Sequence, residues 1–235
     1  MKHAILVQGL AFGDEAKGAT VDFLCRKFPV DLIVRFNGGS QAAHNVVTPE
    51  GVHHTFSQFG SGMLANDRVR THLSQYMLVD PVTMMNEAEA LTVARKEEWR
   101  RVADLGELEP LPESVWERTT VDPRCVVITP FHKLVNQLRE KERGAARHGS
   151  CGMGVGVARE WSLDTGQEAL VVGDLTDYDL TKKKLHAQQL RAYIEFGNLA
   201  DITRIDVIDL TIDYYNWTKH VTFFSRTTKD RLGCL

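Results

Sequence analysis

The chain has 235 residues, a formal net charge of −3 and 43% hydrophobic residues, which are ordinary values for a globular protein. This charge gives no broad electrostatic reason to expect nucleic-acid binding, and no apolar run is long enough to span a membrane. The four cysteines show no paired metal-binding spacing. Free thiols in a reducing compartment are the simplest interpretation, so we expect a cytoplasmic protein.

The first informative stretch is residues 9–22, which follow the apolar run of residues 4–7. The pattern predicts a strand, a glycine-bearing turn and a helix, an order that aims unpaired N–H groups of the helix at the turn and makes an anion site. Lys17 adds a cation that can reach phosphate, and Asp14 and Glu15 suggest a Mg²⁺ ion bridging carboxylate and phosphate. The spacing is not that of a Walker A loop, and an ordinary strand-to-helix turn with a solvated first helical turn remains the alternative.

The second informative stretch is the turn of residues 37–45, which follows a predicted short buried strand over residues 31–36. Its glycines permit unusual backbone dihedrals, and Gln41, His44 and Asn45 are polar groups clustered on it. A loop at the end of a parallel strand, beside an anion-binding turn, is where α/β sheets bind ligands. A lone histidine is most often structural, so His44 needs this context to count as a candidate.

The middle of the chain predicts structural elements. Adjacent His53 and His54 would point to opposite sides of a strand, so they are poor joint metal ligands. Residues 84–102 predict a helix whose charge-rich section is a solvated face. Residues 106–123, with three prolines and many acids, predict a surface excursion. Further along we expect a short buried strand over 124–129 and strands over 169–172, 205–210 and 220–224. We also expect a helix with an apolar stripe after Pro130 and a weaker helix over 182–196.

The third informative stretch is residues 148–156, a loop with four glycines, Ser150 and Cys151. Exposed N–H groups and a hydroxyl suit a second anion, and Arg159 after the loop could add charge. A flexible glycine loop is the alternative. Cys151 has little support as a nucleophile, because no obvious base is fixed beside it.

With these three loops in order, the chain resembles the adenylosuccinate synthetase family. The first loop, Gly13-Asp-Glu-Ala-Lys-Gly18, resembles the family's Gly-Asp-Glu-Gly-Lys-Gly. The second, Gly38-Gly-Ser-Gln-Ala-Ala-His-Asn45, resembles Gly-Gly-x-Asn-Ala-Gly-His-Thr, and the third, Ser150-Cys-Gly-Met-Gly-Val-Gly156, resembles Thr-Thr-Gly-x-Gly-x-Gly. Residues 54–62 and 148–152 look closer to the bacteriophage branch, which includes enzymes that condense dGMP with aspartate.

The resemblance implies an α/β fold, with a mainly parallel sheet flanked by helices and a P-loop-NTPase-like arrangement. Residues 1–235 would form a single domain, the N-terminal part of the family fold. The implied reaction belongs to purine biosynthesis: condensation of IMP or dGMP with L-aspartate through a 6-phosphoryl intermediate, to give adenylosuccinate or its 2-amino counterpart. The implied cofactors are Mg²⁺ and a phosphoryl donor, GTP or ATP. A homodimer is implied, with no nucleic-acid or membrane partner.

The resemblance also implies roles for individual residues. Asp14 would take the proton from N1 of the purine and ligate Mg²⁺, with the backbone carbonyl of Ala43 as a second ligand. Lys17 would hold the transferring phosphoryl group, and His44 would assist its transfer. Gln41 would contact the purine nucleotide, and Ser150 its 5′-phosphate. The other implied nucleotide- and phosphate-binding residues are Gly13, Glu15, Ala16, Gly18, Gly38, Gly39, Asn45, Cys151 and Arg159.

The resemblance covers only the N-terminal half to two-thirds of the family fold, and the match is lost after His220-Val-Thr-Phe-Phe224. We therefore expect a truncated or frame-shifted chain, or one complemented by another chain. The alternative function is a catalytically incomplete nucleotide-binding or regulatory homologue. Asp14 favours IMP as the substrate while the phage-like loops favour dGMP, so both remain open.

Overall fold

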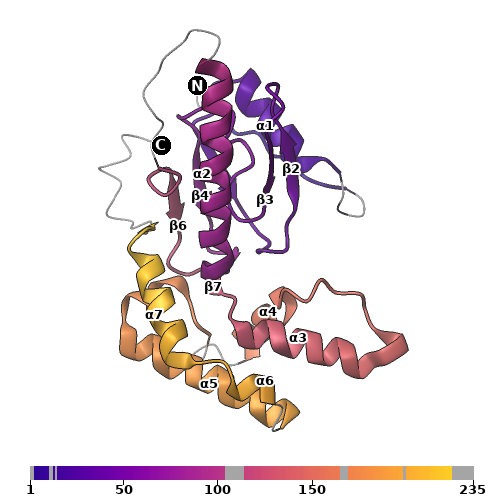
Figure 1. Ribbon diagram of the computed structural model, residues 1–235. Helices are drawn as coiled ribbons and strands as arrows, with labels where there is room; N and C mark the ends of the chain where they lie inside the picture. Colours follow the sequence, from indigo (N-terminus) through magenta and orange to yellow (C-terminus); the bar gives the residue numbers. More distant parts are fainter. Residues whose placement is uncertain are drawn as a thin grey trace.

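The computed structural model describes residues 3–10, 13, 15–103, 114–164, 169–197 and 200–223. Figure 1 shows two tiers: an upper one with the main sheet and helices α1 (Lys17–Lys27) and α2 (Pro81–Ala103), and a lower one made of helices. The lower helices are α3 (Pro130–Arg143), α4 (Val155–Asp164), α5 (Tyr178–Phe196), α6 (Ala200–Thr203) and α7 (Val207–Thr218). Two 3₁₀ turns, Gly144–Ala146 and Val172–Thr176, follow α3 and precede α5.

The main sheet has four strands in the order β1-β4-β6-β8, and every neighbouring pair is parallel. Its strands are β1 (Leu32–Arg35), β4 (Arg70–Leu73), β6 (Thr119–Val121) and β8 (Thr222–Phe223). An antiparallel hairpin joins β2 (His44–Val47) to β3 (His53–Phe56), and β5 (Leu78–Val79) pairs in parallel with β7 (Val126–Val127). The expected α/β fold with a mainly parallel sheet and flanking helices is confirmed.

The predicted helices after Pro130 and over 182–196 are confirmed as α3 and α5, and the short strands expected near 124–129 and 220–224 are present as β7 and β8. In the hairpin, His53 is exposed and His54 buried, as expected for adjacent residues of one strand. The strand over residues 31–36 also forms, but Val34 is 50% and Phe36 60% exposed. The expected burial is wrong because β1 is an edge strand of the sheet.

Two apolar runs that predicted strands do not form them. Residues 4–7 have no ladder partner among the described strands, and Ile5 and Leu6 are 57% and 84% exposed. Residues 205–210 enter α7, because the Asp206 carboxylate accepts hydrogen bonds from the N–H groups of Ile208 and Asp209 and so caps a helix. In the region of residues 169–172, only Val171 makes a bridge, to Val126.

Two segments expected on the surface are instead buried. Residues 119–121 form β6 inside the main sheet, although residues 106–113 of the same predicted excursion lie outside the described ranges. Helix α2 forms as expected, but its charged section is not only a solvated face, since Arg95 and Glu98 are buried. Arg95 donates to Asp67 at 2.6 Å, and such pairing makes the burial of a charged residue tolerable.

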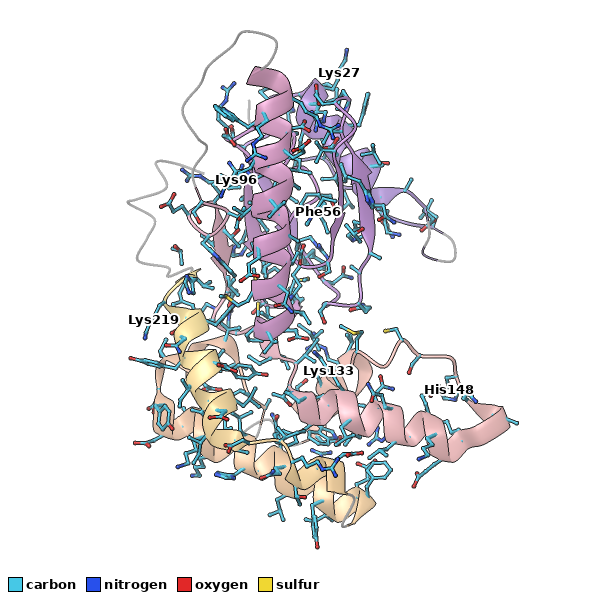
Figure 2. The ribbon with its side chains drawn as sticks, in the orientation of Figure 1. Lys27, Phe56, Lys96, Lys133, His148 and Lys219 are labelled. Carbon is cyan, nitrogen blue, oxygen red and sulfur yellow. The ribbon has the colours of Figure 1, made fainter. Side chains whose placement is uncertain are left out.

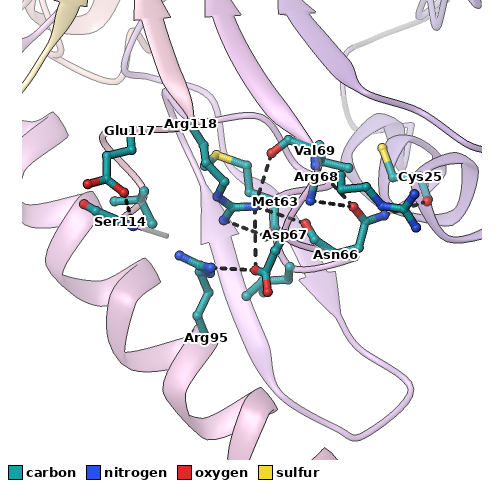
Figure 3. A network of polar contacts seen from close by, with 12 residues as sticks. Cys25, Met63, Asn66, Asp67, Arg68, Val69, Arg95, Ser114, Glu117 and Arg118 are labelled. Carbon is teal, nitrogen blue, oxygen red and sulfur yellow. Dashed lines mark hydrogen bonds and ion pairs between the residues drawn. The ribbon is translucent and has the colours of Figure 1, made fainter. Parts of the chain in front are cut away.

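A buried arginine holds the segment between β3 and β4 (Figure 3). Arg118 has a fully buried side chain, and its guanidinium donates to the backbone carbonyls of Met63, Asn66 and Val69 at 3.0 to 3.2 Å. Asp67 lies 4.0 Å from the same guanidinium and supplies a carboxylate. Arg118, the residue that precedes β6, therefore ties residues 63–69 to that strand.

Candidate active site

The first loop ends in an uncapped helix. α1 begins at Lys17 after Ala16, which has a left-handed backbone (φ 53°, ψ 27°) and makes no side-chain cap. No described side chain caps the first N–H groups of α1, an arrangement that suits an anion, as the sequence predicted. Gly13 has φ 105°, which suits glycine. Asp14, the predicted base and metal ligand, lies outside the described residues.

Glu15 and Lys17 hold each other and the loop. The Glu15 carboxylate accepts from Leu10 N at 2.8 Å and lies 3.2 Å from Lys17 Nζ. Lys17 Nζ also donates to the Gly13 carbonyl at 2.8 Å. A methyl group on Gly9 would lie 2.0 Å from the Glu15 carboxylate, so a larger residue there would displace this carboxylate from its present position. Glu15 therefore makes contacts within the loop and holds the Lys17 ammonium close to the loop backbone.

The second loop meets the first through Gly18 and His44. A Cβ atom on Gly18 would lie 2.5 Å from His44 Cβ, so the helix and β2 can approach this closely only with glycine at that position. Burial, and after it the nearby charges of Arg35 and Lys17, together lower the pKa of His44 to about 4. The imidazole is consequently neutral at pH 7, with one N–H donor and one acceptor.

Arg35, at the end of β1, is a charged neighbour of His44 that the sequence did not single out. Its Nη1 donates to the Phe59 carbonyl at 3.0 Å. The loop that carries Phe59 is held by the Glu87 carboxylate, which accepts from the backbone N–H groups of residues 57, 58 and 59. A second cation thus stands beside the imidazole. Its position at the carboxyl end of a strand was the only signal available for it.

Of the other candidates in the second loop, the two glycines are packed against other elements, while the remaining residues are exposed. Gly38 (φ 92°) accepts from Leu78 N at 2.8 Å, and a Cβ atom on Gly39 would lie 3.2 Å from Val155 Cγ2, at the start of α4. These two glycines hold the loop against β5 and α4. Gln41 and Ala43 are exposed, while Asn45 Oδ1 accepts from the Thr55 hydroxyl at 2.6 Å within the hairpin.

The third loop returns along α3 toward α4. Figure 2 shows Lys133 near the start of α3 and His148 beside the last turns of this helix. Ser150 and Cys151 are exposed, and the Ser150 hydroxyl accepts from Asn136 Nδ2 at 2.9 Å. Arg159 Nη2 donates to the Tyr76 carbonyl at 3.0 Å, so this side chain reaches the turn between β4 and β5.

No group of three or more His, Cys, Asp or Glu residues suited to a metal ion occurs within the described ranges. Magnesium is usually bound through one or two carboxylates together with phosphate oxygens. Among the described helices, none is both long enough and apolar enough to cross a membrane.

The geometry brings together the N-terminus of α1, the Lys17 ammonium and the neutral His44 imidazole. The second loop also packs through Gly39 against the start of α4, which follows the third loop. Such an arrangement can bind phosphate and stabilise charge on a transferring phosphoryl group. The sequence reasoning found Lys17 and His44. It missed Arg35 and Asn136.

A family model described as adenylosuccinate synthetase matches residues 6–232. The chain is 32% identical to the adenylosuccinate synthetase of Psychrobacter sp. over 211 residues, which is 89% of this chain and 42% of that protein. It is also 32% identical to that of Thermoplasma acidophilum over 199 residues, 83% of this chain and 40% of the other. A fully ligated adenylosuccinate synthetase structure from Plasmodium falciparum aligns with a TM-score of 0.68 and 17% identity, over 89% of this chain and 44% of that one. The chain thus spans less than half the length of these relatives.

Proposed function

The chain belongs to the adenylosuccinate synthetase family, whose members are ligases, and we propose that it serves the reaction of that family. The reaction is condensation of IMP or dGMP with L-aspartate, driven by GTP or ATP, to adenylosuccinate or its 2-amino counterpart. The observation that carries the proposal is the contact of Gly18 with His44, because it joins the phosphate-binding end of α1 to the imidazole. Residues 1–235 are proposed to act as one domain, and two copies as a homodimer.

Phosphorylation of the purine 6-oxygen turns a very poor leaving group into a good one, which the amine of aspartate can displace. Asp14 is proposed to remove the N1 proton, which raises the nucleophilicity of that oxygen. Lys17, held by the Gly13 carbonyl and Glu15, is proposed to bind the transferring phosphoryl group.

His44 is neutral in the free chain because burial and two neighbouring cations lower its pKa to about 4. It is proposed to donate its N–H to the phosphoryl group as negative charge accumulates there. An arriving phosphate also favours the imidazolium form, so the same anion that binds would raise the pKa of His44.

The proposed cofactor is Mg²⁺, held by Asp14 and the Ala43 carbonyl together with phosphate oxygens; it would supply positive charge to the phosphates. The proposed nucleotide-binding residues are those expected from the sequence. Gly18 and Gly39 allow close packing of these loops, and Gly38 has the positive φ of 92° that suits glycine. Gln41 is exposed and available to a purine, and Ser150 to a 5′-phosphate.

The test is a steady-state assay with aspartate, Mg²⁺, GTP or ATP, and either IMP or dGMP, alongside equilibrium binding of each nucleotide. Asp14→Asn should abolish product and leave nucleotide binding measurable. Asp31→Asn, at an exposed position before β1, is the matched control and should keep activity. Turnover by Asp14→Asn at the normal rate would show that Asp14 is not the base. Binding without turnover in the unaltered chain would favour the regulatory homologue, and no binding of any nucleotide would refute both.

A further inference from the structure

One side of α3 holds the third loop at two points. Asn136 and Glu140 are four residues apart, so they lie on the same face of the helix. The Asn136 amide bonds to Ser150 and to the backbone N–H of Gly154. The Glu140 carboxylate accepts from Gly149 N at 2.9 Å and from Ser150 N at 3.4 Å.

The contact with Gly154 determines which way the Asn136 amide points. A backbone N–H can only donate, so the group 3.2 Å from Gly154 N must be the carbonyl oxygen of the Asn136 side chain. The NH₂ group then faces Ser150 Oγ, 2.9 Å away. Gly154 is buried with φ 73°, and a Cβ atom there would lie 2.7 Å from the backbone of α3, so its N–H stays in place.

The amide orientation in turn determines the role of the serine hydroxyl. Because Asn136 donates to Ser150 Oγ, the hydroxyl cannot return its proton to Asn136 and must direct it elsewhere. Within the described part of the chain no acceptor receives that proton, and Ser150 is exposed. An unused O–H donor on an exposed loop is suited to an oxygen of a bound anion.

We propose that Asn136 is a positioning residue which presents the Ser150 hydroxyl as a hydrogen-bond donor to the 5′-phosphate of the purine nucleoside monophosphate. This rests on the proposed function, which makes Ser150 a phosphate contact. Asn136 itself does not touch the nucleotide.

Glu140 completes the arrangement from the other side of Ser150. Its second carboxylate oxygen lies 2.6 Å from Arg143 Nη1. The ion pair offsets the negative charge that would otherwise oppose a phosphate nearby. The Glu140 carboxylate, paired with Arg143, therefore holds the backbone at Gly149 and Ser150, while Asn136 orients the Ser150 side chain.

The experiment measures the dissociation constants of IMP and inosine, and of dGMP and deoxyguanosine, for the full chain. The ratio of nucleoside to nucleotide dissociation constants reports the contribution of the phosphate alone. We compare Asn136→Ala, Ser150→Ala and the double variant, with Gln137→Ala as the control. Gln137 is the next residue of α3 and also carries an amide, but it makes no hydrogen bond to the loop among the described contacts.

Asn136→Ala and Ser150→Ala should each lower the ratio by about tenfold, as for loss of one hydrogen bond to a charged group. The double variant should lower it no further, because Asn136 acts through Ser150. Nucleoside binding and the Gln137→Ala variant should stay unchanged. If the losses of the two single variants add up in the double variant, or if the ratio is unchanged in Asn136→Ala, the positioning role of Asn136 is refuted. Either result leaves the proposed function standing. If the unaltered chain bound neither nucleotide, the proposed function itself would fail and the positioning role with it.

Discussion

A buried carboxyl group, Glu98, paired with the half-buried Glu50 gives this protein a predictable pH dependence of stability. Glu98, on α2, hydrogen-bonds to the Glu50 carboxyl group and accepts from the Thr48 hydroxyl. Its side chain is only 12% exposed. Burial is the largest cause that raises the pKa of Glu98, and Glu50 raises it further, to about 7.

The sign follows from comparing the folded and unfolded states. Between the ordinary value of 4.5 and about 7, the folded protein keeps a proton on Glu98 that the unfolded chain has lost. The free energy of unfolding therefore falls as pH rises through this window and stops falling above the folded pKa. At 1.36 kcal/mol per pH unit, the whole loss from this one group is about 3 kcal/mol.

Glu98→Gln removes the ionisation and keeps a group of similar size that can still hydrogen-bond. We expect this variant to be more stable than the unaltered protein at pH 8, by about 1 to 3 kcal/mol, and to lose this advantage at pH 4 to 5. Glu89→Gln, the same substitution at an exposed position of α2, should show no such pH-dependent difference.

The assay is urea unfolding at one-unit steps from pH 4 to 9, with the free energies of unfolding compared between the protein and its variant. Glu50 is hydrogen-bonded to Glu98 and its pKa depends on it, so the difference reports the Glu50–Glu98 pair, while the remaining titrating groups are shared. If the two curves run parallel across this range, the proton on Glu98 has no part in stability and the reasoning is wrong.

Three further predictions concern single residues. Ala16→Gly should stabilise the protein to urea by up to about 1 kcal/mol, because relief of a left-handed alanine outweighs the extra freedom of unfolded glycine; lower stability would contradict the strain. Arg118→Met should cost about 3 to 5 kcal/mol and lower Tm, because three backbone carbonyls lose their donor; an unchanged Tm would show that they need none. The His44 ring should titrate near pH 4 by NMR in the free chain and at higher pH with GTP bound. A value near 6.5 in the free chain would contradict its burial between two cations.

The helices were predicted well where one face of the sequence repeats with the helical period. Phe131 and Val135 on α3, and Met84 and Leu91 on α2, are buried as this period requires. The same rule could not assign residues 205–210, because a run of Ile and Val suits a strand or a buried helix equally. The cap at Asp206 decided that case.

The candidate site was predicted in part for a related reason. Glycines, a lysine and a histidine in short motifs carry their own chemical signature, so Lys17 and His44 could be named from the chain. Arg35 and Asn136 carry no such signature. Arg35 reaches Phe59 across the fold, and Asn136 is recognised only from the loop residues Ser150 and Gly154 that it contacts.

The sequence alone determined the family, the three loops and the identity of most helices, because these depend on residues close together in the chain. The tertiary structure decided which segments, distant in the chain, contact one another. It paired residues 4–7 with none of the described strands, buried β6 inside the sheet and set Gly18 against His44. A local pattern states which face of a segment is apolar. It cannot state which distant backbone or charge will meet that face, since such contacts exist only after the chain has folded.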